Sequence, residues 1–222
     1  MRVLIANDGP IGEGTEGERV LSLVIALADT GHAVRAIDFG ASDNGSKRIA
    51  LRRVLCRRDD PQAELPFEPP CFGAADGSRR GFADLTSEQL HALRDTMRQA
   101  LDQEIADFDP QIVHCQHVWM MGHLALESGV PYVLTAQADE FAELGRDERY
   151  GRLAAEAAEN AGRVLVATAD LAAEVQKQFG DLEGRIIVLP SMREDAQDAS
   201  PAMLAELLDI YNRVLDERWG RT

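Results

Sequence analysis

The sequence is short of positive charge. Its 222 residues include 23 Lys and Arg against 38 Asp and Glu, which gives a formal net charge of −15. Proteins that bind nucleic-acid phosphates or anionic lipids through general electrostatics need a surplus of basic side chains. The deficit therefore argues against a nonspecific nucleic-acid-binding protein and against a general binder of anionic membranes.

Cysteine and long apolar runs are also scarce. Cys56, Cys71 and Cys115 are an odd number without the paired spacing of a zinc ribbon, so they suggest neither a disulfide framework nor structural zinc. No apolar run approaches the roughly 18 residues that span a bilayer, and Asp8 comes too early for a signal peptide. We expect a cytoplasmic protein, and peripheral contact with a membrane stays open.

Several enzyme motifs are missing. The sequence contains neither the Gly-x-Ser-x-Gly motif of serine hydrolases nor the Gly-Lys-Ser/Thr motif of P-loop nucleotidases. His114 and Cys115 would point to opposite faces of a strand, which leaves no clean tetrahedral set with His117 and His123. We expect no metal site and no bound cofactor.

The sequence does contain a recurring alternation of short aliphatic runs and segments of helical period. This alternation is typical of a parallel sheet with crossover helices. The predicted strands are 2–6, 33–38, 111–115, 132–135, 163–167 and 185–189. The predicted helices are 17–30, 86–107, 118–128, 147–161 and 170–179. We expect an α/β fold of three layers, Rossmann-like, with about six or seven parallel strands.

Two segments interrupt the alternation. Residues 59–81 are rich in Pro and Gly and predict a long loop, of a kind that is usually functional or mobile. Residues 47–58 hold six of the 23 basic residues, and their apolar residues cluster on a helical wheel. We interpret 47–58 as a helix whose basic face is either solvated or a docking patch for an anionic acceptor or a membrane. The candidate patch consists of Lys47, Arg48, Arg52, Arg53, Arg57 and Arg58.

The end of the sequence predicts one more helix. Residues 191–200 form a polar connector, and Ser200 followed by Pro201 is a favourable helix start. Residues 201–219 carry an apolar stripe that must be buried against the domain or a partner. We expect this helix to return to the sheet, so that 1–222 form a single domain.

A glycine motif follows the first predicted strand. Gly12, Gly14 and Gly17 have the spacing Gly-x-Gly-x-x-Gly, and Asp38 ends the next strand, as in dinucleotide-binding proteins. However, five residues separate the strand from the first glycine, and nearby acids would repel a pyrophosphate. These acids are Glu13, Glu16 and Glu18. An enzyme that uses NAD(P) stays open as a third interpretation.

Five segments, taken in order, resemble one known domain. They are 17–34 (GERV to LADTGHAV), 108–117 (FDPQIVHCQH), 130–135 (VPYVLT), 163–168 (RVLVAT) and 185–190 (RIIVLP). Their order is similar to that of the N-terminal domain of family 4 glycosyltransferases of the GT-B fold. The resemblance implies a domain that holds the acceptor, while a second domain holds the nucleotide sugar.

The resemblance also implies candidate site residues. Gln137 stands where the family has the His of a Thr-x-His motif, and Gln cannot act as a general acid or base. Asp139 is a candidate base in its place. His117 is the preferred polar group of a retained site, because sites in open α/β sheets lie at the carboxyl ends of strands. The candidate acceptor- or anion-binding residues are Gly12, Gly14, Gly17, Glu18, His117 and Gln137.

The donor domain of the family has no counterpart between Pro190 and Ser200. The helix at 201–219, however, resembles the C-terminal helix that crosses back onto the first domain in full-length members. This combination implies an acceptor half that is inactive alone and gains a nucleotide sugar through a donor-domain protein or a second copy. Its acceptor would be a sugar or a lipid-linked acceptor. A non-catalytic binding or regulatory module is the alternative.

Overall fold

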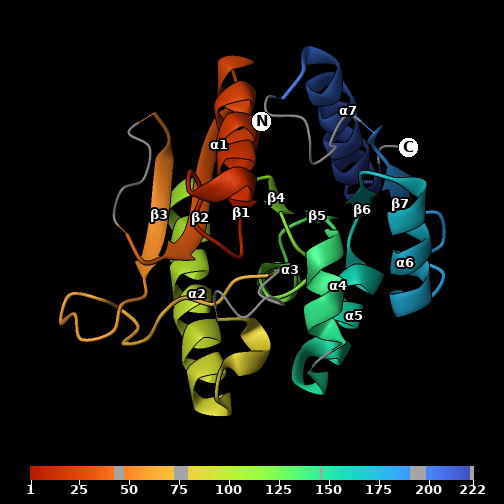
Figure 1. Ribbon diagram of the computed structural model, residues 1–222. Helices are drawn as coiled ribbons and strands as arrows, with labels where there is room; N and C mark the ends of the chain where they lie inside the picture. The colour runs from red at the N-terminus through yellow and green to blue at the C-terminus, as the bar shows by residue number, and fades with distance from the viewer. Residues whose placement is uncertain (43–47, 73–79, 146, 191–198, 221–222) are drawn as a thin grey trace.

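The computed structural model describes residues 1–42, 48–72, 80–145, 147–190 and 199–220. These residues form one sheet of seven parallel strands in the order β3-β2-β1-β4-β5-β6-β7 (Figure 1). The strands are β1 (Arg2–Ala6), β2 (Ala33–Gly40), β3 (Ala50–Leu55), β4 (Ile112–Cys115), β5 (Tyr132–Thr135), β6 (Arg163–Val166) and β7 (Ile186–Val188). The expected Rossmann-like α/β fold is confirmed.

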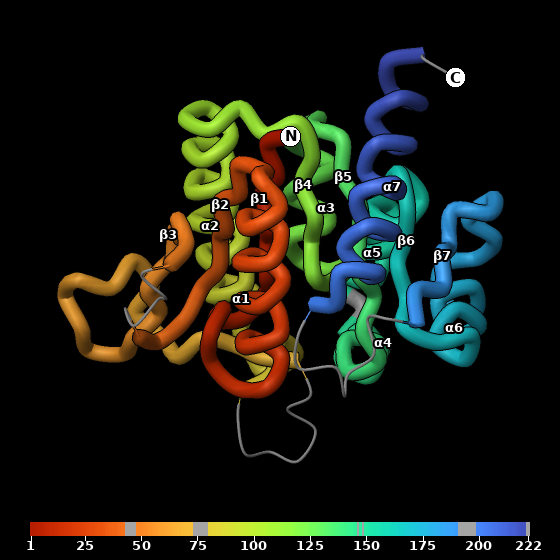
Figure 2. Tube along the Cα trace, turned by 90° about the horizontal axis from the view of Figure 1, so that it is seen from above, coloured from red at the N-terminus to blue at the C-terminus, as the bar shows by residue number. Residues whose placement is uncertain are grey.

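Helices cover both faces of the sheet, with α1 and α7 on one face and α2, α3 and α5 on the other (Figure 2). Successive side chains of a strand point to opposite faces of the sheet. In β1, Val3 and Ile5 therefore pack with α1 and α7, whereas Leu4 and Ala6 pack on the face covered by α2, α3 and α5. The helices are α1 (Gly14–Asp29), α2 (Ser87–Phe108), α3 (Met121–Ser128), α4 (Ala138–Leu144), α5 (Glu148–Asn160), α6 (Ala169–Phe179) and α7 (Pro201–Arg218). Among the described residues, no helix has the length and apolar character needed to cross a bilayer.

Helix α7 packs back on the sheet, as expected. Ser200 caps it by accepting a hydrogen bond from Met203 N–H at 3.2 Å, and Pro201 occupies its first turn. Leu207 and Tyr211 are fully buried against the layer that also contains α1. The predicted connector at 191–200 lies outside the described residues except for its last two positions.

The helix predicted at 47–58 is wrong, because 50–55 form the edge strand β3. The backbone of β3 pairs with β2 from Arg35 to Gly40, and these hydrogen bonds outweigh a helical spacing of apolar residues. Arg53 is buried in this strand and forms an ion pair with the fully buried Asp38 of β2. Arg53 therefore does not belong to a surface patch.

Other basic residues of the candidate patch have acidic partners within the chain. Arg52 pairs with Glu64, and Arg57 pairs with Asp60 at 2.9 Å. The remaining members are two exposed arginines and a lysine outside the described residues: Arg48, Arg58 and Lys47. The basic run thus serves partly to pair the edge strand with the loop that follows it.

The loop predicted at 59–81 is confirmed where the structure describes it. Its described parts, 59–72 and 80–81, contain no helix and no strand longer than a single bridge between Cys56 and Leu65. Phe67 and Phe72 are buried in the core beside α2. The loop is therefore anchored across the carboxyl end of the sheet by aromatic side chains.

Candidate functional site

The candidate site lies where the direction of the chain across the sheet reverses. The chain runs from β1 outward to β3 and returns to β4, which pairs with β1 on its other side. In open α/β sheets, ligands bind outside the carboxyl ends of the strands at this switch point. The segments that follow β1, β4 and β5 meet there.

His117 follows β4 and is fully buried, with its ring 4.3 Å from that of Phe72. Neither of its ring nitrogens forms a hydrogen bond within the described residues, although Nε2 lies 3.3 Å from Oε1 of Glu16. Burial lowers the pKa of His117 to about 4, and Asp139 only partly offsets this shift. The ring is neutral at pH 7, with an unprotonated nitrogen to offer to a ligand.

Asp139 follows β5 and faces the same point. Its Oδ1 atom is buried and has no hydrogen-bond partner within the described residues. Burial raises the pKa of Asp139, and Glu16 raises it further, while His117 lowers it. One side-chain atom from each of Glu16, His117 and Asp139 lies within 4.8 Å of the others. We call these three residues the switch-point cluster.

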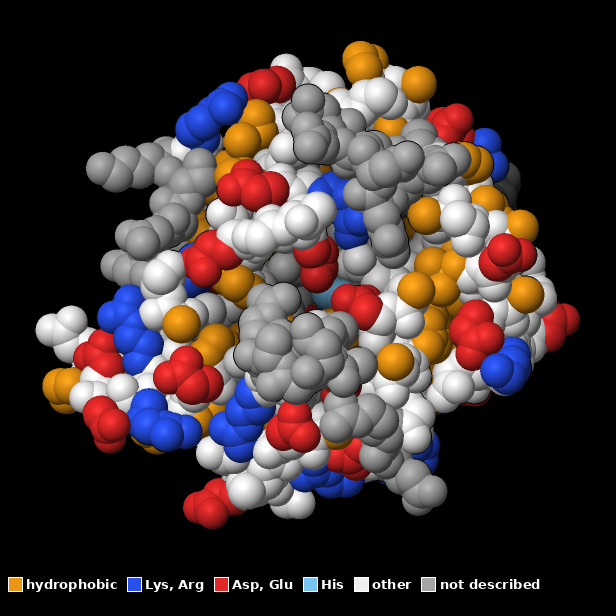
Figure 3. Space-filling view, in the orientation of Figure 1, with side chains coloured by type: hydrophobic (Ala, Val, Ile, Leu, Met, Phe, Trp, Pro, Cys, Tyr) orange, Lys and Arg blue, Asp and Glu red, His pale blue; other side chains and the backbone are white. Residues whose placement is uncertain are grey.

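The space-filling view shows a histidine and acidic side chains close together on one face of the molecule (Figure 3). A histidine side chain is visible between acidic side chains near the middle of the face shown (Figure 3). Within the switch-point cluster, Glu16 is partly exposed, whereas His117 is buried. Glu16 is therefore the more exposed of these two members of the cluster.

Gln137 holds the segments of the site together. Its Nε2 donates to the Gln116 carbonyl at 2.8 Å and to Oε1 of Glu16 at 3.1 Å, and its Oε1 accepts from Arg19 at 2.7 Å. Its backbone N–H donates to the carboxylate of Glu140 at 2.9 Å. Because both amide hydrogens are already used, Gln137 orients Glu16 rather than presenting a free amide to a ligand.

The glycine loop turns its amide groups inward. The Gly12 N–H donates to the Gly17 carbonyl at 2.8 Å, and the Ile11 N–H donates to Oδ2 of Asp38 at 2.6 Å. A Cβ atom on Gly17 would lie 2.2 Å from the Pro10 carbonyl oxygen, so only glycine permits this closure. The expectation that Gly12 offers its N–H to an anion is therefore wrong.

Two other predicted members of the anion-binding set lie toward solvent. Helix α1 begins at Gly14, and both Gly14 and Glu18 are exposed. Glu18 does not contribute to the switch-point cluster, whereas Glu16, two residues earlier, does. The helix begins three residues before the predicted start at residue 17, and this shift decides which glutamate faces the site.

Asp38 is not available to the ribose of a dinucleotide. Its Oδ1 and Oδ2 atoms accept from Arg53 at 2.8 and 2.6 Å, and the side chain is completely buried. Burial raises the pKa of Asp38, while the Arg53 hydrogen bonds lower it. The acidic residue of the dinucleotide motif thus has a structural partner, which removes the main support for an NAD(P)-binding site.

Two buried carboxylates that sequence reasoning missed shape the site. Asp8 accepts from Met121 N–H at 3.2 Å, and Glu140 accepts from Val118 N–H at 2.9 Å. Burial raises the pKa of both carboxyl groups well above the usual range. Together they fix the segment between β4 and α3, beside His117. Asp8 could have been found from its place just beyond the predicted first strand.

The other two histidines that the sequence suggested for a metal, His114 and His123, are used in packing. His114 lies in the core between Thr135 and Tyr211, and burial lowers its pKa to about 3. His123 Nε2 lies 3.6 Å from Oε2 of Glu156 on α5. The set considered from sequence for a metal does not assemble, because His114 is separated from His117 by the strand end.

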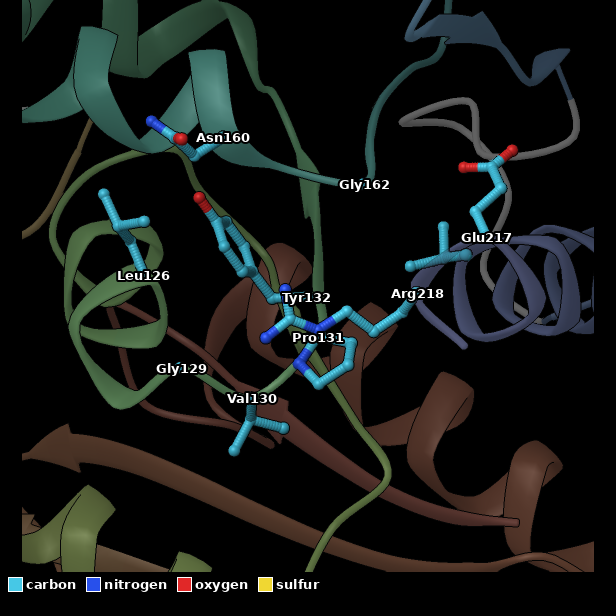
Figure 4. Close-up of a pocket in the computed structure, with 10 residues that line it drawn as sticks. Leu126, Gly129, Val130, Pro131, Tyr132, Asn160, Gly162, Glu217 and Arg218 are labelled. Carbon is cyan, nitrogen blue, oxygen red and sulfur yellow. The ribbon is translucent and has the colours of Figure 1, made fainter. Parts of the chain in front are cut away.

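A separate pocket opens at the amino end of the sheet, the end opposite to the switch point, and Figure 4 shows residues that line it. Its volume is about 400 Å³, and it lies between β5 and the end of α7. Pro131, Tyr132, Glu217 and Arg218 contribute to its wall, and its described lining includes no imidazole or thiol. The described lining of this pocket therefore lacks the imidazole that the switch-point cluster has.

Comparison with solved structures identifies proteins of the same fold. Sucrose-phosphate synthase from Thermosynechococcus elongatus matches with a TM-score of 0.59 at 16% identity, over 85% of this chain and 47% of that chain. The lipopolysaccharide outer core galactosyltransferase WaaB matches at 0.52 and 14%, over 85% and 45%. UDP-GlcNAc 2-epimerase from Methanocaldococcus jannaschii matches at 0.53 and 12%, over 85% and 45%. The chain thus spans about half the length of these proteins.

One solved piece of the same synthase, made of segments 27–220 and 406–426, matches over 96% of this chain and 99% of its own length, with a TM-score of 0.53 at 13% identity. No curated protein matches the chain. A family model described as "Glycosyl transferase 4-like domain" matches residues 14–191, which is most of the chain. This chain therefore belongs to the family of glycosyl transferase 4-like domains.

Proposed function

We propose that this chain supplies the acceptor side of a glycosyl transfer reaction, with the acceptor hydroxyl bound at the switch-point cluster. The observation that carries the proposal is the pair His117 and Asp139, whose buried polar atoms have no hydrogen-bond partners within the described residues. Buried polar atoms are normally satisfied, so an unsatisfied pair at a switch point favours a ligand with its own donors and acceptors. A sugar hydroxyl offers both.

The chemistry assigns a role to each group. The acceptor hydroxyl donates its proton to Oδ1 of Asp139, and its oxygen accepts a hydrogen bond from the N–H of the neutral His117 ring. Asp139 takes the hydroxyl proton as the acceptor oxygen bonds to the anomeric carbon of the donor sugar and the nucleoside diphosphate leaves with the electrons of the broken bond. A carboxyl group whose pKa is raised by burial is a stronger base than an exposed one.

The nucleotide sugar requires a second site, which a donor-domain protein or a second copy of this chain provides in the proposed arrangement. Gln137 supports a division of roles, because its amide orients Glu16 and leaves proton transfer to Asp139. The Gln137 amide, whose hydrogen-bonding groups are already used, also favours the second candidate, which is a binding module without catalysis. Purification of the chain from its native cell separates the two: a donor-type domain in the complex supports transfer, and an unrelated regulator supports the module.

The acceptor site is tested by saturation-transfer NMR with glucose, galactose, mannose, N-acetylglucosamine and fructose 6-phosphate as probes. We expect at least one probe to bind, and Asp139→Leu to abolish its signal. Glu18→Gln is the matched control, since it removes a carboxylate from the exposed face of the same region. Binding that survives Asp139→Leu unchanged would place the sugar elsewhere.

Donor dependence is tested with UDP-glucose and GDP-mannose in the presence of the bound probe. The chain alone is expected to leave both nucleotide sugars intact. Turnover by the chain alone at an ordinary enzymatic rate, roughly 1–1,000 per second, would contradict the proposed division between two partners.

A further inference from the structure

The switch-point cluster has the composition and spacing of a metal site. We propose that Glu16, His117 and Asp139 bind one first-row divalent metal ion, of which zinc fits best. This inference differs from the expectation drawn from the sequence, which considered His114, His117, His123 and Cys115. The fold instead joins His117 to two carboxylates from α1 and α4.

The distances suit a tetrahedral ion. Zinc bonds of about 2.0–2.2 Å place neighbouring ligand atoms about 3.3–3.5 Å apart. Nε2 of His117 and Oε1 of Glu16 are separated by 3.3 Å, and the three ligand atoms lie within 4.8 Å of one another.

The polar atoms of His117 and Asp139, which also carry the proposed function, provide a second reason for a ligand beside the distances. Both ring nitrogens of the buried His117 and the buried Oδ1 of Asp139 have no hydrogen-bond partner within the described residues. Such atoms are rare in folded proteins, and each usually signals a bound water, ion or substrate. A single cation bonded to Nε2 of His117 and Oδ1 of Asp139 would provide a partner for two of these three atoms.

The charges of the three side chains match those of a divalent ion, because two carboxylates and a neutral imidazole carry a total charge of −2. The guanidinium of Arg19 is a positive group nearby, and it donates a hydrogen bond to Oε1 of Gln137 at 2.7 Å. One nitrogen and two oxygen ligands suit zinc, cobalt, manganese or iron(II), whereas magnesium and calcium prefer oxygen alone. The Gln137 amide that donates to Glu16 holds this carboxylate in a fixed orientation, as partners of metal ligands commonly do.

Three protein ligands leave a fourth position of the ion open. A ligand oxygen would occupy that position, and Asp139 would then serve as a metal ligand rather than as a base. Metal binding itself does not depend on the proposed glycosyl transfer, because it requires only the three side chains. The two proposals can therefore fail separately.

The test uses the whole chain after treatment with a chelator and its removal. Titration with ZnCl₂ at pH 7, followed by calorimetry, is expected to give one ion per chain, and CoCl₂ is expected to give the visible absorption of a tetrahedral site. Glu16→Gln, His117→Gln and Asp139→Asn should each weaken binding about tenfold or more. Glu16→Gln keeps the shape of a partly exposed residue, so it tests the site even where the buried variants unfold.

Two matched controls remove the same chemical groups at exposed positions: Glu18→Gln on α1 and His91→Gln on α2. Both should leave the affinity unchanged. The proposal would be overturned if the chain bound no zinc at millimolar concentration. It would also be overturned if the chain bound one zinc ion with the same affinity in the wild type and in all three cluster variants. The latter result would indicate a surface ion, for example at His32 Nδ1, which lies 3.3 Å from the amino group of Met1.

Discussion

Nδ1 of His114 lies 2.6 Å from the phenolic oxygen of Tyr211, and this contact joins β4 to α7 inside the core. The other ring nitrogen lies 2.7 Å from Oγ1 of Thr135 on β5. The ring is neutral, because burial lowers its pKa to about 3. Helix α7 is therefore fixed by a polar contact as well as by apolar packing, on the strand that leads to His117.

Loss of the phenolic hydroxyl should destabilise the fold. Tyr211→Phe leaves a buried ring nitrogen without its partner, which costs about 1–3 kcal/mol of unfolding free energy. Chemical denaturation measures the change. Asn212→Ala, at the next and exposed position of α7, should change stability by less than about 0.5 kcal/mol. Equal stabilities of the two variants would show that the contact contributes nothing.

The ion pair between Arg53 and Asp38 should be essential to the edge of the sheet. Arg53→Met leaves the carboxylate of Asp38 buried without its partner, at a cost of about 3–5 kcal/mol. Arg52→Met, in the neighbouring position of β3, removes only a solvent-accessible pair and should cost about 0–1 kcal/mol. A small effect of Arg53→Met would instead place this side chain on the surface, as the basic run suggested.

Gly17 should not tolerate a side chain. In Gly17→Ala the new Cβ would meet the Pro10 carbonyl oxygen at 2.2 Å, so the loop that precedes α1 must move and stability should fall by about 1–3 kcal/mol. Gly151→Ala is the control, because a Cβ there meets nothing within 4 Å and the helical position gains about 1 kcal/mol. Thermal unfolding of both variants gives the comparison, and a Gly17→Ala protein as stable as the wild type would contradict the close approach of Gly17 to Pro10.

The acid dependence of stability should contain a contribution from His117. Its pKa falls from 6.5 to about 4 on folding, so between these values the unfolded chain binds a proton that the folded chain does not. Stability is lost as pH falls through this window, by up to about 1.4 kcal/mol per pH unit. His117→Leu should remove that part of the slope in denaturation curves recorded from pH 7 to pH 4.

Asp8 should act in the opposite direction. Burial raises its pKa well above 3.8, so the folded chain keeps a proton that the unfolded chain releases, and stability is lost as pH rises above 3.8. Asp8→Asn removes this loss, and the variant should gain stability relative to the wild type toward neutral pH. The same slope in both proteins would show that Asp8 does not titrate differently on folding.

Most of the sheet could be predicted from sequence because its central strands are short aliphatic runs. β3 could not, since its arginines look solvent-exposed until Asp38 of β2 is known to lie beside Arg53. Helix α4 was missed because its seven residues, 138–144, are too few to show a helical period.

The site was partly predictable for a related reason. His117 and Asp139 follow predicted strands, and strand ends are where ligands bind in this class of fold. Glu16 was not identified as a member, because its direction depends on the residue at which α1 begins. The hydrogen bonds of Gln137 and the inward closure at Gly12 depend on contacts between distant segments, which no local pattern shows.

The most direct test of the acceptor site is the ring ¹H–¹⁵N spectrum of histidine-labelled protein, recorded while a hexose that binds is added. The His117 resonance is assigned by its loss in His117→Gln. Sugar binding at the switch-point cluster predicts a saturable shift of this resonance that follows the same dissociation constant as the saturation-transfer signal. A sugar that binds while the His117 resonance stays unchanged would contradict the account.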